Sequence, residues 1–260
     1  MNPTRRIPRR RSRLALALVA GLAATWPTPA ALAVDGVQLI DATCALAGCF
    51  PGDAPGYPVT ISQAGSYRLA SDLEVADPAL DGIDVTAGGF SGVSLDLNGF
   101  TIQGGYACSI SPPNCAATAG YGISTSTLLR VSNGVVTYFG LAGIHATWQM
   151  EVTNVVVRFI GGNGIESTQG ARLRDLTIQA TRHDGVHVLT GSITDSIFSA
   201  IAGDGIDTDS LAVRDVAMNG VNGKSIRFSG MGSYAGCQLS TAPVGGTNLG
   251  KNACGSGVCP

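Results

Sequence analysis

The chain has 260 residues, and its 16 basic and 18 acidic side chains give a formal net charge of −2. Six of the basic residues precede residue 34 and none of the acidic ones do, so the rest of the chain carries ten basic and 18 acidic residues, a net charge of −8. An acidic surface repels phosphate backbones, which excludes nucleic acid as an expected partner. The length beyond residue 33 is sufficient for one domain with a substantial core.

Residues 1–33 have the order of regions that is typical of a signal peptide. Arginines come first, the apolar run Leu14–Ala24 follows, and Ala31–Ala33 supplies small residues before a cleavage point. The apolar run is shorter than the ~20 residues that span a bilayer, and no later stretch is long and apolar enough to do so. The sequence therefore predicts bacterial export by a removed signal peptide, to the periplasm or outside the cell, with no transmembrane segment in the product.

Residues 34–80 are predicted to form a lead-in and an N-terminal cap. The part up to Gly56 is rich in Pro, Gly and Cys and has no periodicity, which is typical of irregular structure. Val59–Ile61 and Tyr67–Leu69 alternate apolar and polar residues on either side of Gln63-Ala64-Gly65, which predicts a short strand pair. We expect this pair to cover the open end of the structure that follows.

The central region, residues 81–230, repeats a short unit. Between residues 143 and 215 each unit starts with Gly and an aliphatic residue and ends with an aliphatic residue, a spacer and Asn or Asp, with a period of 20 or 21 residues. The starting glycines are Gly143, Gly164, Gly185 and Gly205, and the closing residues are Asn154, Asp175, Asp195 and Asp215. A fixed period of this length is the mark of a solenoid, here of roughly seven stacked coils.

The repeats predict an all-β fold, a right-handed parallel β-helix. After each Gly the side chains alternate, so that Ile144 and Ala146 would face the core while His145 faces solvent. Strands stacked at ~4.8 Å then pair with the same strand in the coils above and below. We expect each starting glycine either at positive φ or at a tight corner where a Cβ is costly. We expect the Asn and Asp residues to stack as a ladder at another corner.

The cysteines predict local disulfides. About 14 extra residues lie between Asn98 and Gly122, which predicts an insertion near residues 104–119 that projects from the coil. A C-terminal cap is predicted over residues 231–260. The predicted bridges are Cys44 with Cys49, Cys108 with Cys115, and Cys254 with Cys259, which leaves Cys237 unpaired. A bridge between Cys237 and Cys254 stays open as an alternative, because sequence does not determine connectivity.

A resemblance to known proteins rests on three features of the sequence. These are the stretch Ser94–Ile102, the Gly-Ile or Gly-Val repeats, and Asn248-Leu249-Gly250 followed by Cys254 and Cys259-Pro260. In these features residues 58–260 resemble exported bacterial right-handed parallel β-helix repeat proteins, whose fold is that of the pectate lyase-like superfamily. The resemblance implies the fold and no particular reaction, because fold does not determine function. The motifs of polygalacturonases and mannuronan epimerases are absent from the sequence.

One outward column of the predicted coils carries residues with acid/base chemistry. It contains His145, Glu166, His187 and Asp207, which the period places one rung apart, at ~5 Å. Histidine exchanges protons near neutral pH and neighbouring carboxylates tune it, so this column is the candidate catalytic site. The alternative is an ordinary solvated strand face on which opposite charges pair.

A candidate calcium site lies in the same part of the sequence. Asp204, Asp207 and Asp209 bring three carboxylates within six residues, and carboxylate oxygens are the ligands that Ca²⁺ prefers. The position of Asp204 in a turn also fits a purely structural role. No other cofactor is indicated.

Two functions agree with these residues. The first is an exported β-helix that binds or packs against extracellular or cell-surface polysaccharide without catalysis, with candidate contacts at Tyr121, Trp148, Arg174 and Arg214. The second is a polysaccharide lyase or glycoside hydrolase that uses the His/Glu/His/Asp column. A groove bounded by loops would favour the enzyme, whereas a flat exposed column favours binding. The sequence indicates no oligomeric state.

Overall fold

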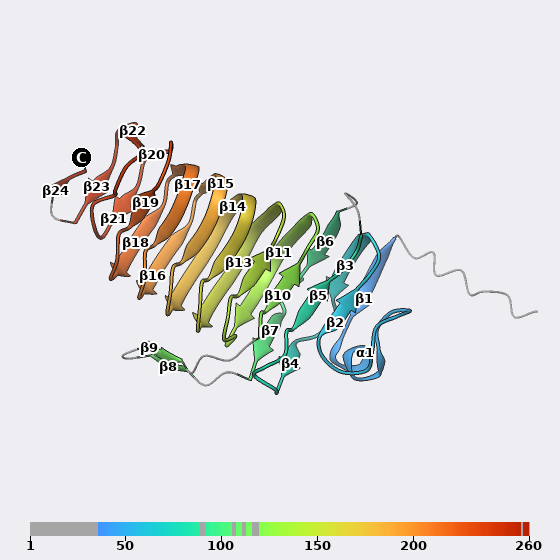
Figure 1. Cartoon of the computed structure of the whole chain (residues 1–260). Coiled ribbons are helices and arrows are strands. Elements are labelled where there is room, and N and C mark those ends of the chain that lie inside the picture. The colour runs from blue at the N-terminus through green and yellow to red at the C-terminus, as the bar shows by residue number, and fades with distance from the viewer. Residues whose placement is uncertain are drawn as a thin grey trace, which may run out of the picture. The chain divides into compact units, whose positions relative to one another are not determined.

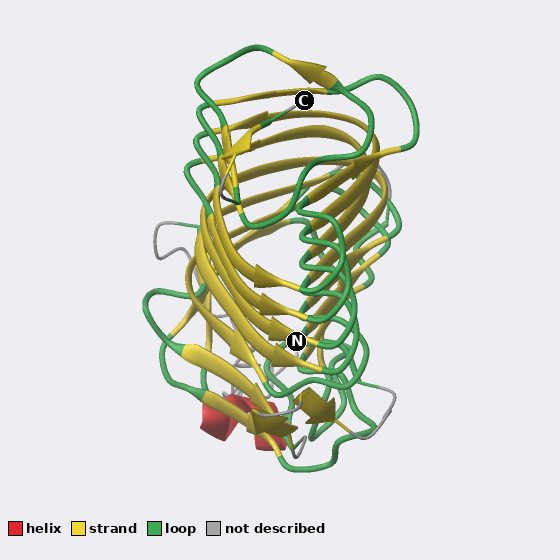
Figure 2. Cartoon of the chain, turned by 90° about the vertical axis from the view of Figure 1, so that its left-hand side faces the viewer, coloured by secondary structure: helices red, strands yellow, loops and turns green. Residues whose placement is uncertain are grey.

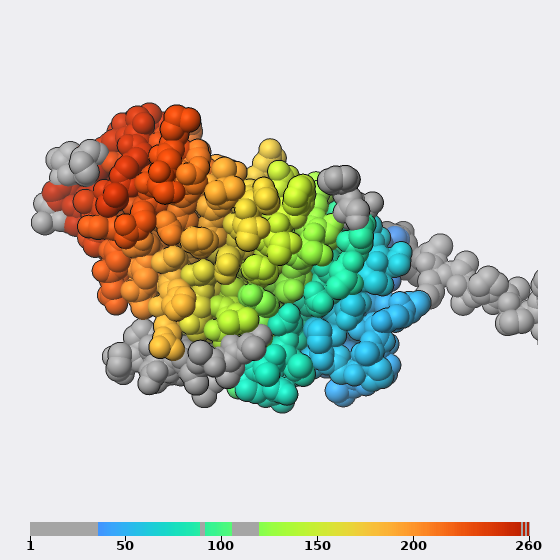
Figure 3. Space-filling model, viewed as in Figure 1, coloured from blue at the N-terminus to red at the C-terminus, as the bar shows by residue number. Residues whose placement is uncertain are grey.

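The computed structural model describes residues 36–88, 92–105, 108–110, 113–115, 120–255 and 257–259. The predicted signal peptide lies outside the described residues. Within the unit Asp35–Pro260, 22 strands form one sheet that winds around an axis in successive turns (Figure 1, Figure 2). Successive bands of colour lie side by side on the surface, because each coil packs on the next (Figure 3). The chain is therefore a parallel β-helix, and the predicted fold class is confirmed.

Three strand segments from each coil define three faces of the solenoid. Face A consists of β2 (Val59–Ile61), β5 (Ile83–Val85), β10 (Ile123–Thr125), β12 (Ile144–Ala146), the first residues of β14 (Ile165–Thr181), β15 (Val186–Thr194) and β17 (Ile206–Arg214), and β19 (Ile226–Phe228). Face B consists of β3 (Gly65–Leu69), β6 (Val93–Asp96), the first parts of β11 (Leu129–Thr137) and β13 (Met150–Ile160), the following parts of β14, β15 and β17, and β20 (Ser233–Ala235). Face C consists of β4 (Leu73–Val75), β7 (Thr101–Gly104), the last parts of β11, β13 and β14, β16 (Ile197–Ile201), β18 (Ala217–Val221) and β21 (Gln238–Leu239).

The predicted alternation of side chains builds the core. On face A the inward positions of successive coils are buried, and they include Ile144 and Ala146, Ile165 and Ser167, Val186 and Val188, and Ile206 and Thr208. Parallel pairing stacks each of these residues on its counterpart in the next coil. Burial of apolar side chains removes them from water and is the main force that holds the stack together.

The Asn and Asp residues that close each unit form the predicted ladder. They occupy the left-handed region, with φ between 52° and 59° at Asn98, Asn133, Asn154, Asp175, Asp195 and Asp215. Asn and Asp tolerate this conformation better than other residues that carry a Cβ. The Asn154 amide donates to Asn133 Oδ1 at 3.0 Å, so the ladder is also hydrogen-bonded between coils. A second left-handed corner follows five residues later, at Tyr138, Phe159, Ala180, Ala200 and Gly220, and the sequence does not predict it.

The glycines that start each unit lie at a tight corner, which is one of the two roles predicted for them. None of Gly143, Gly164 and Gly185 has a positive φ. A Cβ on Gly164 would lie 2.5 Å from the carbonyl oxygen of Gly185, and one on Gly143 would lie 2.7 Å from that of Gly164. The corner is therefore too tight for a side chain, because the backbone of the next coil occupies that space.

The N-terminal part differs from the prediction of an isolated strand pair. β2 pairs in parallel with β5, and β3 pairs in parallel with β6, so that both segments belong to a first coil that precedes residue 81. This arrangement buries Ile61 and Leu69 completely against the stack. The end is covered by β1 (Val37–Ile40), which pairs with β3, and by α1 (Ala42–Ala47), where irregular structure is predicted. Asp41 caps α1 by accepting a hydrogen bond from the Cys44 amide at 2.8 Å.

Disulfides close both ends of the described chain. Cys44 is bonded to Cys49 and Cys254 to Cys259, as predicted, while Cys237 is free and buried, so the alternative Cys237–Cys254 bridge is wrong. Parallel stacking continues into the predicted C-terminal cap through β22 (Thr247–Asn248) and β23 (Ala253–Cys254), and only β24 (Gly257–Val258) pairs antiparallel. None of the helices in the described residues has the length and apolar character that crossing a bilayer requires.

The predicted insertion contains a short hairpin. β8 (Cys108–Ile110) and β9 (Pro113–Cys115) pair antiparallel, with Cys108 opposite Cys115 in the register. Their side chains lie outside the described residues, and so does the predicted bridge between them. The hairpin contacts β13, which belongs to faces B and C.

Candidate functional site

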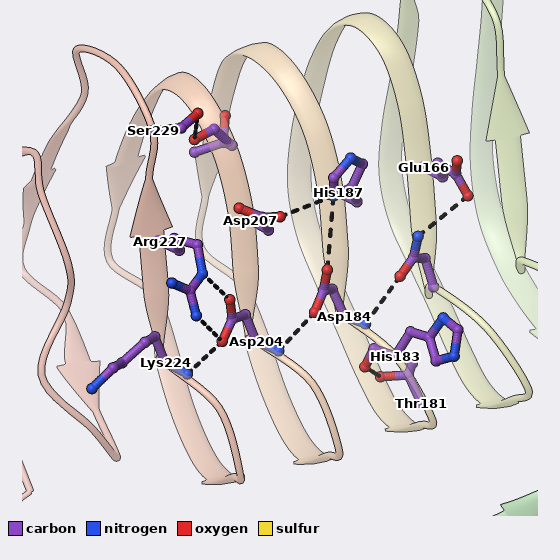
Figure 4. A network of polar contacts seen from close by, with 12 residues as sticks. Glu166, Thr181, His183, Asp184, His187, Asp204, Asp207, Lys224, Arg227 and Ser229 are labelled. Atoms are coloured by element: carbon purple, nitrogen blue, oxygen red, sulfur yellow. Dashed lines mark hydrogen bonds and ion pairs between the residues drawn. The ribbon is translucent and has the colours of Figure 1, made fainter.

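The outward column of face A has the predicted register. His145 pairs with Glu166, Glu166 with His187, and His187 with Asp207, each one coil apart. The column continues beyond the prediction to Arg227, which pairs with Asp207. All five side chains lie on the outer side of the coil, and four of them are labelled in Figure 4.

The column separates into groups that do not share one hydrogen-bond chain. The His145 ring stacks on Tyr121, with ring centroids 4.7 Å apart, and its Nδ1 atom is buried without a hydrogen-bond partner among the described residues. Burial raises the pKa of Tyr121, and the charges of Glu166 and Asp81 raise it further. Glu166 accepts a hydrogen bond at 3.3 Å from Asn163 at the preceding corner. His145 and Glu166 are therefore adjacent in register, yet each has a partner elsewhere.

His187 is the centre of the most strongly charged group. Its Nδ1 atom lies 3.3 Å from Asp207 Oδ2 and 3.7 Å from Asp184 Oδ2 (Figure 4). The longer distance exceeds a hydrogen bond, so the Asp184 contact is electrostatic and becomes an ion pair when the imidazole is protonated. The pKa of His187 is raised above its ordinary value, chiefly by Asp184 and then by Asp207, with a further contribution from Glu166, while burial opposes the shift. The imidazole therefore keeps its proton to a higher pH than a free histidine does.

A ladder of polar side chains runs along the corner before face A. Asn163 Oδ1 accepts from the Asp184 amide at 3.0 Å, Asp184 Oδ1 from the Asp204 amide at 2.7 Å, and Asp204 Oδ1 from the Lys224 amide at 2.6 Å. Each residue therefore uses one side-chain oxygen to hold the next coil, which leaves Asp184 Oδ2 directed at His187. Asp204 is the most buried of these carboxylates and also pairs with Arg227.

The structure does not bring Asp204, Asp207 and Asp209, the predicted calcium ligands, together as one site. Asp204 is bound by the Arg227 guanidinium and by the Lys224 amide, so it has the structural role that was the alternative interpretation. Asp209 lies on the exposed side of face A, within 3.4 Å of the Ser229 hydroxyl. Asp207 is grouped instead with Asp184 and His187, and all three ligand atoms of this set lie within 4.8 Å of one another.

The predicted contacts for sugars are spread over different faces. Tyr121 is half-buried against His145, whereas 42% of Trp148 is exposed at the corner between faces A and B. Arg174 and Arg214 lie on face B in one outward column, with Thr194 between them in the register. Arg174 pairs with Asp175 at 3.4 Å.

Face B carries two adjoining hollows. One, of about 340 Å³, is lined by Arg130, Glu151 and Arg172, together with Gln149 and Thr190 at the corner. The other, of about 280 Å³, is lined by Glu151, Thr153, Arg172, Arg174, Ser192 and Thr194. Glu151 and Arg172 belong to both, so the hollows are continuous across several coils. On face A a hollow of about 310 Å³ lies over Thr168, His187, Leu189, Asp207 and Asp209.

Two residues of the charged group on face A were not among the predicted site residues. Asp184 precedes Gly185 as Asn163 precedes Gly164 and Asp204 precedes Gly205, so the repeat itself marks this corner. Arg227 follows Ile226, one period after Asp207. The molecule is therefore a parallel β-helix with a histidine–carboxylate cluster on face A. Its neighbouring face B carries a hollow lined by arginine and hydroxyl side chains. Comparisons with protein-family models, curated proteins and solved structures give no match.

Proposed function

We propose that this chain is exported and binds an extended polysaccharide along face B. The observation that carries the proposal is the continuous hollow over β13, β14 and β15, whose lining includes arginine, glutamate, amide and hydroxyl side chains beside the apolar Leu128 and Met150. Polysaccharides present many hydroxyls, so an array of hydrogen-bonding side chains is suited to bind them. Export agrees with the two disulfides, which are typical of oxidising compartments.

The spacing of face B suits a repeating ligand. Outward side chains recur once per coil, at ~4.8 Å, which is comparable with the length of one sugar ring. One column contains Ser94, Arg130, Glu151, Arg172 and Ser192, and the next contains Ser132, Thr153, Arg174, Thr194 and Arg214. A sugar chain that runs along the axis therefore meets a new pair of polar side chains at each ring.

Arg172 is the central residue of this surface. It lines both hollows. Arg130 is paired with Glu151 at 3.1 Å. By contrast, neither Arg172 nor Arg214 forms an ion pair within the described part of the chain. The Arg172 guanidinium therefore has donors available for a ligand. A hydrogen bond from a charged donor contributes about 1.5–3 kcal/mol, which corresponds to a tenfold or larger change in affinity.

The test is binding to a panel of neutral and uronate polysaccharides by affinity gel electrophoresis. Wild type is expected to be retarded by at least one polysaccharide, and Arg172→Ala is expected to weaken that binding about tenfold. Arg158→Ala is the matched control, because Arg158 is an exposed arginine of face C that lies over the Phe159 ring. Absence of binding across the panel, or an equal loss in the control, would overturn the proposal.

A second candidate function is polysaccharide cleavage at the face A column. The observation that favours it is His187, held between Asp184 and Asp207, since an imidazole oriented by carboxylates is suited to general acid/base catalysis. The same panel is followed by ultraviolet absorbance for unsaturated uronates and by reducing-sugar release, with and without Ca²⁺. Turnover in wild type that is lost in His187→Ala would establish an enzyme, whereas binding without turnover would leave face B as the functional surface.

A further inference from the structure

We propose that Asp184, His187 and Asp207 form a binding site for Zn²⁺ or a similar divalent transition metal. This inference concerns face A and is independent of polysaccharide binding on face B. The three residues come from two adjacent coils: Asp184 and His187 flank the start of β15, and Asp207 is the register partner of His187 in β17. Their ligand atoms converge on one point of the surface (Figure 4).

The distances suit a metal ion. Zn²⁺ binds imidazole nitrogen and carboxylate oxygen at about 2.0–2.2 Å, so two ligands of a tetrahedral ion lie about 3.4 Å apart. The His187 Nδ1 atom is 3.3 Å from Asp207 Oδ2 and 3.7 Å from Asp184 Oδ2, and no pair in the set exceeds 4.8 Å. An ion placed between the three atoms can contact all of them after small side-chain movements. The fourth position faces solvent, because 49% of the His187 side chain is exposed.

The charges favour a divalent cation. The carboxylates of Asp184 and Asp207 lie 3.7 and 3.3 Å from His187 Nδ1, and Glu166 is the register neighbour of His187 in β14. Arg227 is paired with the buried Asp204 in the next corner and does not contact this set. A divalent ion bound by a neutral His187 and the carboxylates of Asp184 and Asp207 would bring a charge of +2 against the two negative charges of its ligands.

The surrounding structure fixes the ligands. Asp184 Oδ1 accepts a hydrogen bond from the Asp204 amide at 2.7 Å, and this bond orients Asp184 Oδ2 toward His187. His187 and Asp207 both lie on paired strands whose inward neighbours, Val186 and Ile206, are completely buried. Outer hydrogen bonds of this kind hold metal ligands in place. Because the set combines an imidazole with carboxylates, it suits Zn²⁺ better than Ca²⁺, which prefers oxygen ligands alone.

The test is isothermal titration calorimetry of Zn²⁺ into the full chain after removal of metal with EDTA. Wild type is expected to bind one Zn²⁺, and His187→Gln and Asp207→Asn are each expected to raise the Kd at least tenfold. His183→Gln is the matched control, because His183 is an exposed histidine on the same corner that does not belong to the set. Ca²⁺ at the same concentration is expected to leave the Zn²⁺ isotherm unchanged.

The outcomes decide the proposal in either direction. Binding that is lost in His187→Gln and Asp207→Asn, and kept in His183→Gln, supports the site. Absence of binding in wild type, or unchanged binding in His187→Gln with native circular dichroism, overturns it. Equal loss in all three variants also overturns it, because the loss would then not be specific to the proposed ligands. Asp207→Asn guards against a folding artefact, because the Asp207 side chain lies on the outer side of the coil and has no hydrogen bond to a backbone group within the described residues.

Discussion

Faces A and B share one backbone and differ in what they present to solvent. The same coils supply both, and the inward residues of both are buried and mostly aliphatic, as Ile165 on face A and Leu173 on face B show. Outside, face A pairs its charges within and between coils around His187, whereas face B leaves Arg172 without an ion pair in the described residues. The fold therefore sets the interior of each coil, while the exterior is open to a different chemistry on each face.

The largest effect is expected from the shared interior. Ile165→Ala and Leu173→Ala should each lower the free energy of unfolding by about 2–5 kcal/mol, because each leaves a cavity in the same core. Guanidinium denaturation followed by circular dichroism measures both. Leu189→Ala, at a residue that is 46% exposed, is the control and should cost less than about 1 kcal/mol. A face A variant that behaves like this control would show that the two faces do not share one core.

The next effect concerns the corner that leads into face A. Gly164→Ala should destabilise by about 1–3 kcal/mol, because the new Cβ would lie 2.5 Å from the Gly185 carbonyl oxygen and the coils must move apart. Gly88→Ala is the matched control, since a Cβ there meets nothing within 4 Å. Thermal unfolding of the two variants separates crowding at the corner from the general effect of replacing glycine. Equal behaviour of both would contradict the tight-corner interpretation.

A crossed experiment tests whether the outer surfaces of faces A and B act independently. Arg172→Ala should weaken polysaccharide binding about tenfold and leave the Zn²⁺ isotherm unchanged. His187→Gln should do the reverse, because the two residues line different hollows on different faces. Affinity electrophoresis and calorimetry on the same preparations supply both readouts. Loss of both activities in either variant would mean that the faces are coupled.

The smallest effect is a pH dependence on face B. Burial raises the pKa of Asp96, but the donors Asn133, the Asn98 amide and Arg68, at 3.0, 2.9 and 3.1 Å, outweigh it and lower the pKa overall. A carboxylate with a lowered folded-state pKa contributes stability above its unfolded pKa of about 3.9, and this stability is lost as the pH falls through the folded value. Asp96→Asn should therefore be less stable than wild type at pH 7.

The pH dependence is checked by urea unfolding at several pH values. The stability difference between wild type and Asp96→Asn should shrink as the pH falls below about 4, where the wild-type carboxylate also becomes protonated. The outcome that contradicts this account is a difference that stays constant from pH 7 to pH 3.

Much of the fold could be predicted because its period is local. The spacing of the glycines and of Asn154, Asp175, Asp195 and Asp215 predicts parallel stacking, and stacking at a fixed period places His187 beside Asp207. The short separations of Cys44 from Cys49 and of Cys254 from Cys259 similarly indicate the two bridges. The pairing of the strands near the N-terminus could not be predicted in the same way. β2 and β3 have the same alternation of apolar and polar residues whether they pair with each other or stack on β5 and β6.

The repeat period is enough to predict the coil, its register and the order of residues along each outward column. The division of those columns into sites depends on contacts between coils, which the period does not specify. Asp184 joins His187 because the corner directs one carboxylate oxygen to the Asp204 amide and the other to the imidazole. Asp204 does not join the other predicted calcium ligands, because it forms an ion pair with Arg227 from the next coil. A repeat determines which residues are neighbours, but the direction of a side chain at a corner depends on the partners that the adjacent coils supply.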